Sequence, residues 1–249
     1  METIVPKTSA VLSSLLRADF TTQWRNRRSS VLILLVPVVI LISWKGLISM
    51  VGGPFILSSC ITVGLIAIGL MGYSNAIARD RDKGIFQRLR VTPVPSWAIM
   101  MSRLIVQLVM IMLLTAIVFI AGYYFDGIRI SAGGYALTFF VAIIGGALYL
   151  GLGQLIVGLL MSAETVNSTT RLVYFIFIMV GMVGGLLIEN KSLKNIIQWS
   201  PYGSVKDILS ASMEPSKWSN HTTMALLATI AYAIVFSFLG IKKFKWNSK

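Results

Sequence analysis

The feature that most limits the folds open to this sequence is a series of long apolar stretches separated by short polar segments. Each stretch is about 20 residues long, the length that an α-helix needs to cross the hydrocarbon core of a membrane. Only 12% of the 249 residues are charged, whereas soluble domains carry about 25%. The sequence therefore predicts an all-α integral membrane protein.

Six membrane spans are predicted, and together they make residues 1–249 a single transmembrane domain. The spans cover about 31–50, 55–78, 98–125, 135–161, 172–188 and 224–241. The first is the weakest, because its strongest apolar run ends at Trp44 and Lys45 follows. A lysine can extend its ammonium group to the membrane interface, so we expect this helix to continue past Lys45.

The distribution of basic residues predicts the orientation of the chain. With the N-terminus inside, sixteen of the 22 lysines and arginines fall on the inner side of the membrane. Cytoplasmic loops carry such an excess. We therefore expect both termini in the cytoplasm, in a multi-pass protein with an even number of spans. The same reasoning assigns the net charge of +13 to membrane orientation and not to nucleic-acid binding.

Two segments outside the spans show helical patterns of their own. Before the first span, Leu12, Leu16, Phe20 and Trp24 recur every four residues among polar and basic ones, which predicts an amphipathic helix lying on the inner leaflet. The long outer loop before the last span has apolar residues at helical spacing on both sides of Pro201. It is either a pair of short helices at or in the outer surface, or an ordinary extracellular loop.

The interiors of the spans contain no aspartate, glutamate or histidine, which argues against an ion-coupled pump. Their larger polar residues are Gln154, Gln107 and Asn75, the candidates for lining a translocation path. Gln154 has the alternative role of a hydrogen bond between helices. Small residues such as Gly69 and Gly153 predict close packing of helix backbones.

Nothing in the sequence favours catalysis. The phosphate-binding pattern G-x-x-x-x-G-K-[ST] is absent, so we expect no ATP hydrolysis by this chain. The one cysteine and the one histidine, His221, form no cluster, so no metal site and no bound cofactor are expected.

The segment between the second and third spans is unusually dense in charge, with seven charged residues among the twelve from 79 to 90. Ile85, Phe86 and Leu89 nevertheless share one helical face. Asp80 and Asp82 come first, where carboxylates favour a helix N-terminus. The sequence therefore predicts a short amphipathic cytoplasmic helix with an apolar contact surface for a partner.

This segment, "ARDRDKGIFQRLRVTPVPS", resembles the cytoplasmic motif of ABC-2 type transporter permeases, in particular the drug- and antibiotic-exporting branch. The pattern acidic-x-acidic-x-G-x-x-x-R-L-x-x-T-P is matched in register from Asp80 to Pro93. The sequence departs from it in having aspartate where glutamate is more common, and "IF" where "TL" is common.

The resemblance implies the permease subunit of an ATP-driven exporter in a bacterial or archaeal cell membrane. A separate ATPase subunit would bind the ATP and Mg²⁺, and a second permease chain, identical or paralogous, would complete the membrane domain. The short helix would be the coupling helix that contacts the ATPase. Its expected contact residues are Asp82, Lys83, Gly84, Ile85, Phe86, Arg88 and Leu89.

The implied cargo is a hydrophobic or amphipathic compound, such as a drug, an antibiotic, a peptide or a lipid-like molecule. Two other functions remain open on the sequence. One is a stand-alone channel or secondary carrier, which would need no ATPase. The other is a membrane sensor or immunity protein that transports nothing.

Overall fold

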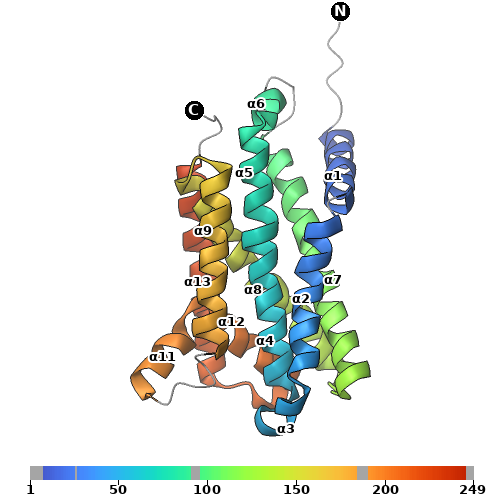
Figure 1. The fold of residues 1–249 in the computed structure, drawn as a ribbon, viewed down its shortest axis with the longest axis vertical. Coiled ribbons are helices and arrows are strands. Elements are labelled where there is room, and N and C mark those ends of the chain that lie inside the picture. The colour runs from blue at the N-terminus through green and yellow to red at the C-terminus, as the bar shows by residue number, and fades with distance from the viewer. Residues whose placement is uncertain (1–7, 26, 91–95, 184–189, 245–249) are drawn as a thin grey trace, which may run out of the picture.

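The computed structural model describes residues 8–25, 27–90, 96–183 and 190–244, and every element within these ranges is helical. The long helices stand side by side in an elongated bundle (Figure 1). One end of the bundle carries α1, α6 and the end of α13, and the other carries α3, α11 and α12. The predicted all-α fold is confirmed.

The long elements are α2 (Arg27–Ser43), α4 (Gly53–Ile66) with η2 (Ala67–Ser74) and α5 (Asn75–Asp82), α7 (Ser96–Asp126), α8 (Ala132–Leu159), α9 (Ala163–Ile176) with η3 (Phe177–Val183), and α13 (Asn220–Lys243). The remaining elements are α1 (Thr8–Arg25), η1 (Lys45–Leu47), α3 (Ile48–Val51), α6 (Ile85–Arg90), α11 (Lys191–Trp199), α12 (Pro201–Met213) and η4 (Pro215–Lys217).

Four helices of the described residues are long and apolar enough to cross a membrane. They are Gly53–Asp82, Trp97–Asp126, Ala132–Leu159 and Asn220–Lys243. A fifth span results if the bent pair Val31–Ser43 and Lys45–Val51 counts as one. The exact number of six spans is therefore not confirmed. The end of the predicted fifth span, residues 184–188, lies outside the described residues.

The expectation of one continuous helix past Lys45 was wrong. The helix α2 ends at Ser43, and the chain bends by 51° before the next helical segment. A bend at this point lets the ammonium group of Lys45 stay at the end of the bundle. The predicted snorkelling of one straight helix is not needed.

Side-chain caps explain where several helices begin. Ser131, Ser162, Ser200 and Ser219 each accept a hydrogen bond from the backbone N–H three residues further on, and Asn190 does so for α11. Such caps satisfy N–H groups that lack a partner in the first helical turn. The cap at Ser162 starts α9 at Ala163 and not at the predicted position 172, which puts Arg171 inside the helix.

The second long helix widens into a π-helix, η2, where it meets α8. A Cβ atom at Gly69 would collide with the backbone of Tyr149, and one at Gly153 would collide with the carbonyl oxygen of Gly69. The Ser74 hydroxyl donates to the Gly69 carbonyl at 2.9 Å, within the wider turn. The glycines therefore allow backbone contact between the two helices, as predicted for small residues in a membrane.

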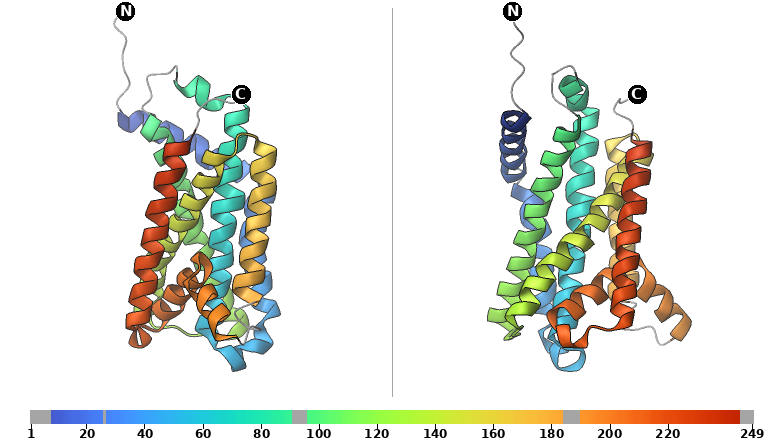
Figure 2. Two further views of the ribbon diagram at one scale, coloured as in Figure 1. Left: turned by 90° about the vertical axis from the view of Figure 1, so that its left-hand side faces the viewer. Right: turned by 180° about the vertical axis from the view of Figure 1, so that it is seen from behind.

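The helix α1 runs across the bundle and not along it (Figure 2, left). It packs on α7, and Leu12 and Leu16 are half-buried. The side chains of Phe20 and Trp24 remain 40% and 72% exposed. A helix is therefore present where the sequence predicts one, and its aromatic side chains Phe20 and Trp24 are exposed.

The loop before the last span contains two short helices, α11 and α12. The second helix, α12, enters the bundle and packs against α4, α8 and α13. Tyr149 of α8 donates a hydrogen bond to the Pro201 carbonyl, and Tyr232 of α13 donates one to the Trp199 carbonyl, both at 3.1 Å. These two tyrosines hold the turn between α11 and α12.

The glycine contact between η2 and α8 generates a stability prediction. Gly153→Leu should lower the unfolding free energy by about 3 kcal/mol, because overpacking against an immovable backbone costs about 1–3 kcal/mol or more. The matched control is Gly133→Leu, since a Cβ at Gly133 meets no atom within 4 Å. Equilibrium unfolding in mixed micelles measures both. Equal stability of the two variants would contradict this packing.

Candidate functional site

The junction between α5 and α6 lies at the end of the bundle that also carries α1 (Figure 1). The helix α5 ends at Asp82, and Gly84 has a φ of 66°. This left-handed conformation favours glycine, and it turns the chain so that α6 leaves the bundle axis. The short helix predicted from the sequence is present at Ile85–Arg90.

Arg81 joins this junction to α8. Its side chain is completely buried, and the guanidinium donates hydrogen bonds to the carbonyls of Val157, Leu160 and Met161 at 2.8, 2.6 and 2.8 Å. The last carbonyls of a helix have no partner within the helix and carry its negative dipole end. A buried cation is therefore stabilised here by the C-terminus of α8.

The two aspartates beside Arg81 join the junction to other helices. Asp80 forms an ion pair with Arg103 of α7, which also lies 3.9 Å from Asp19 of α1. The Asp82 carboxylate accepts a hydrogen bond from the Ala163 N–H at 2.9 Å. Asp82 does serve a helix N-terminus, as the sequence indicates, but the helix is α9 and not α6. Three consecutive residues thus connect α5 to α7, α8 and α9.

Phe86 of α6 is buried within this chain and not presented outward. Its ring packs edge-on against the ring of Phe244, with centroids 6.0 Å apart. The guanidinium of Arg103 lies 5.4 Å from the Phe86 ring centroid. Phe86 therefore fixes α6 to α7 and to the end of α13.

The other predicted contact residues differ in how far their side chains are exposed to solvent. Lys83, Arg88 and Asp82 are exposed, and Gly84 and Ile85 are half-buried. Gln87, which the prediction omits, is exposed as well. The side chain of Leu89 and the motif residues 91–95 lie outside what the structure describes.

A cleft of about 790 Å³ lies between α2 and α9. Its floor is the η2 and α5 part of the second long helix. The floor residues are spaced four apart along one face: Ala67, Met71, Asn75 and Arg79. The floor of the cleft and the junction that leads to α6 therefore belong to one continuous helix.

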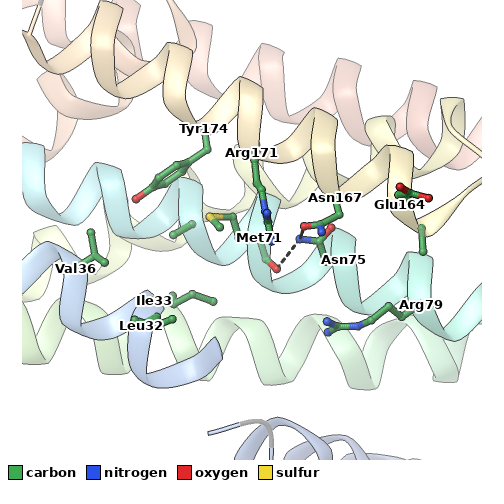
Figure 3. Close-up of a pocket in the computed structure, with 12 residues that line it drawn as sticks. Leu32, Ile33, Val36, Met71, Asn75, Arg79, Glu164, Asn167, Arg171 and Tyr174 are labelled. Atoms are coloured by element: carbon green, nitrogen blue, oxygen red, sulfur yellow. Dashed lines mark hydrogen bonds between the residues drawn. The ribbon is translucent and has the colours of Figure 1, made fainter. Parts of the chain in front are cut away.

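The wall formed by α9 also presents one helical face, with residues three or four apart. Glu164, Asn167, Arg171 and Tyr174 line it, and Arg171 extends from α9 toward the floor (Figure 3). The opposite wall is apolar, with Leu32, Ile33 and Val36 of α2. The cleft is therefore polar on one wall and apolar on the other.

Of the three polar residues predicted to line a path, Asn75 lies in this cleft. Its amide nitrogen is 3.4 Å from the Asn167 side-chain oxygen, and its oxygen is 3.4 Å from the Thr170 hydroxyl (Figure 3 shows the two asparagines). These are long contacts for hydrogen bonds. Asn75 is thus placed between the floor and the α9 wall.

Gln154 and Gln107 do not line the cleft. Gln154 is buried and accepts a hydrogen bond from the Tyr73 hydroxyl at 2.8 Å. Gln154 therefore has the alternative role that the sequence analysis names, a hydrogen bond between two helices. Gln107 is also buried, on α7, and faces Gly72.

Comparison with protein families decides the identity of this architecture. The family model of the ABC-2 type transporter matches residues 10–205, which include α1, the junction and the cleft. The chain belongs to the ABC-2 type transporter family. No curated protein matches the sequence well enough to add a relative.

The membrane domain of an ABC-2 transporter is a non-catalytic permease, and such permeases generally pair with an ATPase subunit. This chain is therefore a multi-pass ABC-2 permease. Its polar contacts at the junction connect α5 to α7, α8 and α9.

Sequence reasoning missed the charged residues of the cleft in this ABC-2 permease. On the sequence alone, Arg79 belongs to the inner loop between the second and third predicted spans. Arg171 belongs to the inner segment between the fourth and fifth. The spacing of Ala67, Met71, Asn75 and Arg79 could have shown that Arg79 shares a face with Asn75. The position of Arg171 could have been found from the serine cap at Ser162.

The far end of the permease holds a second polar pair that the sequence assigned to an outer loop. Lys206 of α12 lies 3.8 Å from Asp207 and 4.4 Å from the centroid of the Phe55 ring. Burial lowers the pKa of Lys206 and raises the pKa of Asp207, while the opposite charge of each neighbour acts against the shift. The pair helps to seat α12 on α4.

Arg81 provides a test of the junction. Arg81→Gln should lower the unfolding free energy by about 3 kcal/mol or more, because buried hydrogen bonds of a charged group are worth about 1.5–3 kcal/mol each. Arg81→Lys should restore only part of it, since an ammonium lacks the planar fork that reaches several carbonyls.

The control is Arg88→Gln, on the exposed face of α6, where a change of no more than about 0.5 kcal/mol is expected. Unfolding in mixed micelles compares the three variants. If Arg81→Gln and Arg88→Gln had the same effect, Arg81 would not be the connection between α5 and α8.

Proposed function

We propose that this permease exports a hydrophobic or amphipathic compound from the cytoplasm, driven by ATP hydrolysis in a separate subunit. One observation carries the proposal. The helix that forms the floor of the cleft continues without a break to Asp82, and α6 follows after Gly84. A displacement of α6 would therefore act directly on the floor of the cleft.

The proposed coupling surface is the exposed part of α6 and of the turn before it. Lys83, Gln87 and Arg88 would contact the ATPase subunit, which would bind the ATP and Mg²⁺. Phe86, buried against Phe244 and Arg103, would transmit the displacement to α7 and α13. This assigns Phe86 an anchoring role and the charged residues the contact role.

The proposed cytoplasmic end of the bundle is the one with α1 and α6. The beginning of α9 and the end of α13 lie there as well (Figure 2). Exposed arginines and lysines of these segments, such as Arg17, Lys83 and Lys242, fit the positive charge of cytoplasmic loops. The exposed Phe20 and Trp24 of α1 suit the inner membrane interface of a bacterial or archaeal cell.

The cleft supports a second permease chain, either a copy or a paralogue. It lies on the face of the bundle between α2 and α9, and no described helix crosses in front of these two (Figure 1). A second chain on this face would convert the open cleft into an enclosed path between the two subunits. The resemblance of the Asp80–Pro93 motif supports a drug or antibiotic as the cargo.

A charge reversal tests the coupling surface. Lys83→Glu combined with Arg88→Glu should reduce recovery of the ATPase subunit about tenfold or more, since each 1.4 kcal/mol of lost affinity is tenfold. The subunit is first identified by mass spectrometry after extraction of the native permease in mild detergent. Its ratio to the permease is then measured for each variant.

The matched control is Lys191→Glu with Lys194→Glu, two exposed lysines of α11 at the opposite end of the bundle. This variant should keep full recovery. Loss of the ATPase subunit in both variants would remove the assignment of the contact to α6. Native permease that brings down no ATPase would favour a stand-alone carrier.

A further inference from the structure

We propose that the cleft recognises an amphipathic anion, whose negatively charged head group binds Arg79 and Arg171 and whose apolar part lies toward Val36 and Ala67. The inference deepens the proposed function, because it names the chemical class of the compound that enters the cleft. It rests on the assignment of that cleft as part of the translocation path.

The first reason is the gradient of polarity along the cleft. Figure 3 shows Arg79 and Glu164 toward the end with α6, Arg171 level with Met71, and Tyr174 further along. Ala67, which also lines the cleft, comes four residues before Met71 on the floor helix. The floor from Arg79 to Ala67 covers about twelve residue steps, or about 18 Å of helix at about 1.5 Å per residue. A molecule with a charged head and an apolar tail fits this gradient.

The second reason is the depth of Arg171. It follows the start of α9 by eight residues, about 12 Å into the helix. The Arg171 side chain is exposed and lines the cleft.

The third reason is a contrast among the arginines at this end. The Arg81 guanidinium donates to three backbone carbonyls, and Arg103 forms ion pairs with Asp80 and Asp19. Arg79 and Arg171, in comparison, form no ion pair with any residue that the structure describes. With Glu164 as the one carboxylate on the lining, the cleft keeps one net positive charge.

The neutral polar groups complete the head-group region. The contacts of Asn75 with Asn167 and with Thr170, both at 3.4 Å, are long, so they can be exchanged for shorter bonds to a ligand at little cost. Arginine binds carboxylate and phosphate groups through two parallel N–H donors. A carboxylate, phosphate or sulfate head group would satisfy both sets of donors.

Binding of matched amphiphiles to the purified full-length permease in a neutral detergent tests the proposal. Dodecyl phosphate should bind about tenfold more tightly than dodecyltrimethylammonium, which has the same tail and the opposite charge. Inorganic phosphate should bind far more weakly than dodecyl phosphate, because it has no tail. Equal affinity for dodecyl phosphate and dodecyltrimethylammonium would overturn the proposal. Equal affinity for dodecyl phosphate and inorganic phosphate would overturn it as well.

The variant Arg79→Gln with Arg171→Gln should abolish the preference for the anion, and Glu164→Gln should strengthen it. The control, Arg17→Gln with Arg25→Gln, removes two exposed arginines from α1 at the same end of the bundle and should keep the preference. A preference lost in the control, or kept in the cleft variant, would place the anion outside the cleft. Melting curves check that each variant is folded. If the double variant is unfolded, the single variants Arg79→Gln and Arg171→Gln are measured in its place.

The source of the anion is decided by a second arm. Native mass spectrometry of permease from bilayer discs compares bound phosphatidylglycerol with bound phosphatidylcholine. Enrichment of phosphatidylglycerol that depends on Arg79 and Arg171 supports a membrane lipid as ligand. Binding of dodecyl phosphate without this enrichment supports a free amphiphile. Both measurements are made without the ATPase subunit, so they do not depend on whether that subunit binds to α6. Absence of an anion preference would contradict this inference but not the proposed contact between α6 and the ATPase subunit.

Discussion

The buried guanidinium of Arg81 is the interaction on which the rest of this permease depends. A charge in this position would be expelled from the bundle if the C-terminus of α8 did not present three carbonyls to it. The same three carbonyls would lack partners without the arginine. Because each side satisfies the other, α5 and α8 cannot separate here without leaving buried polar groups unpaired.

The neighbours of Arg81 extend this constraint to the remaining helices. Asp80 reaches Arg103 on α7, and Asp82 reaches the first turn of α9. Both walls of the cleft are then coupled to its floor: α9 through Asp82, and α2 through its packing on η2 and α7. The position of α5 therefore affects the width of the cleft.

The sequence predicts the helical fold, most span positions and the short helix α6, because each leaves a local signal of hydropathy or spacing. It could not predict that Phe86 is buried, since an apolar residue on a short helix packs equally well on its own chain or on a partner. The bend at Lys45 and the arginine-lined cleft were also missed. Both depend on contacts between helices far apart in the sequence, and no local pattern encodes them.

The position of Arg171 connects energy input with the choice of cargo. It lies on α9, whose first turn is bound by Asp82, so a displacement of α5 carries Arg171 with it or breaks the bond to Ala163. Arg79 moves with the floor in either case. Movement of α6 that breaks this bond would therefore change the distance between the two arginines that face the cleft. An anion held by both would be bound tightly in one arrangement and weakly in the other, which is the condition under which a conformational change releases its ligand.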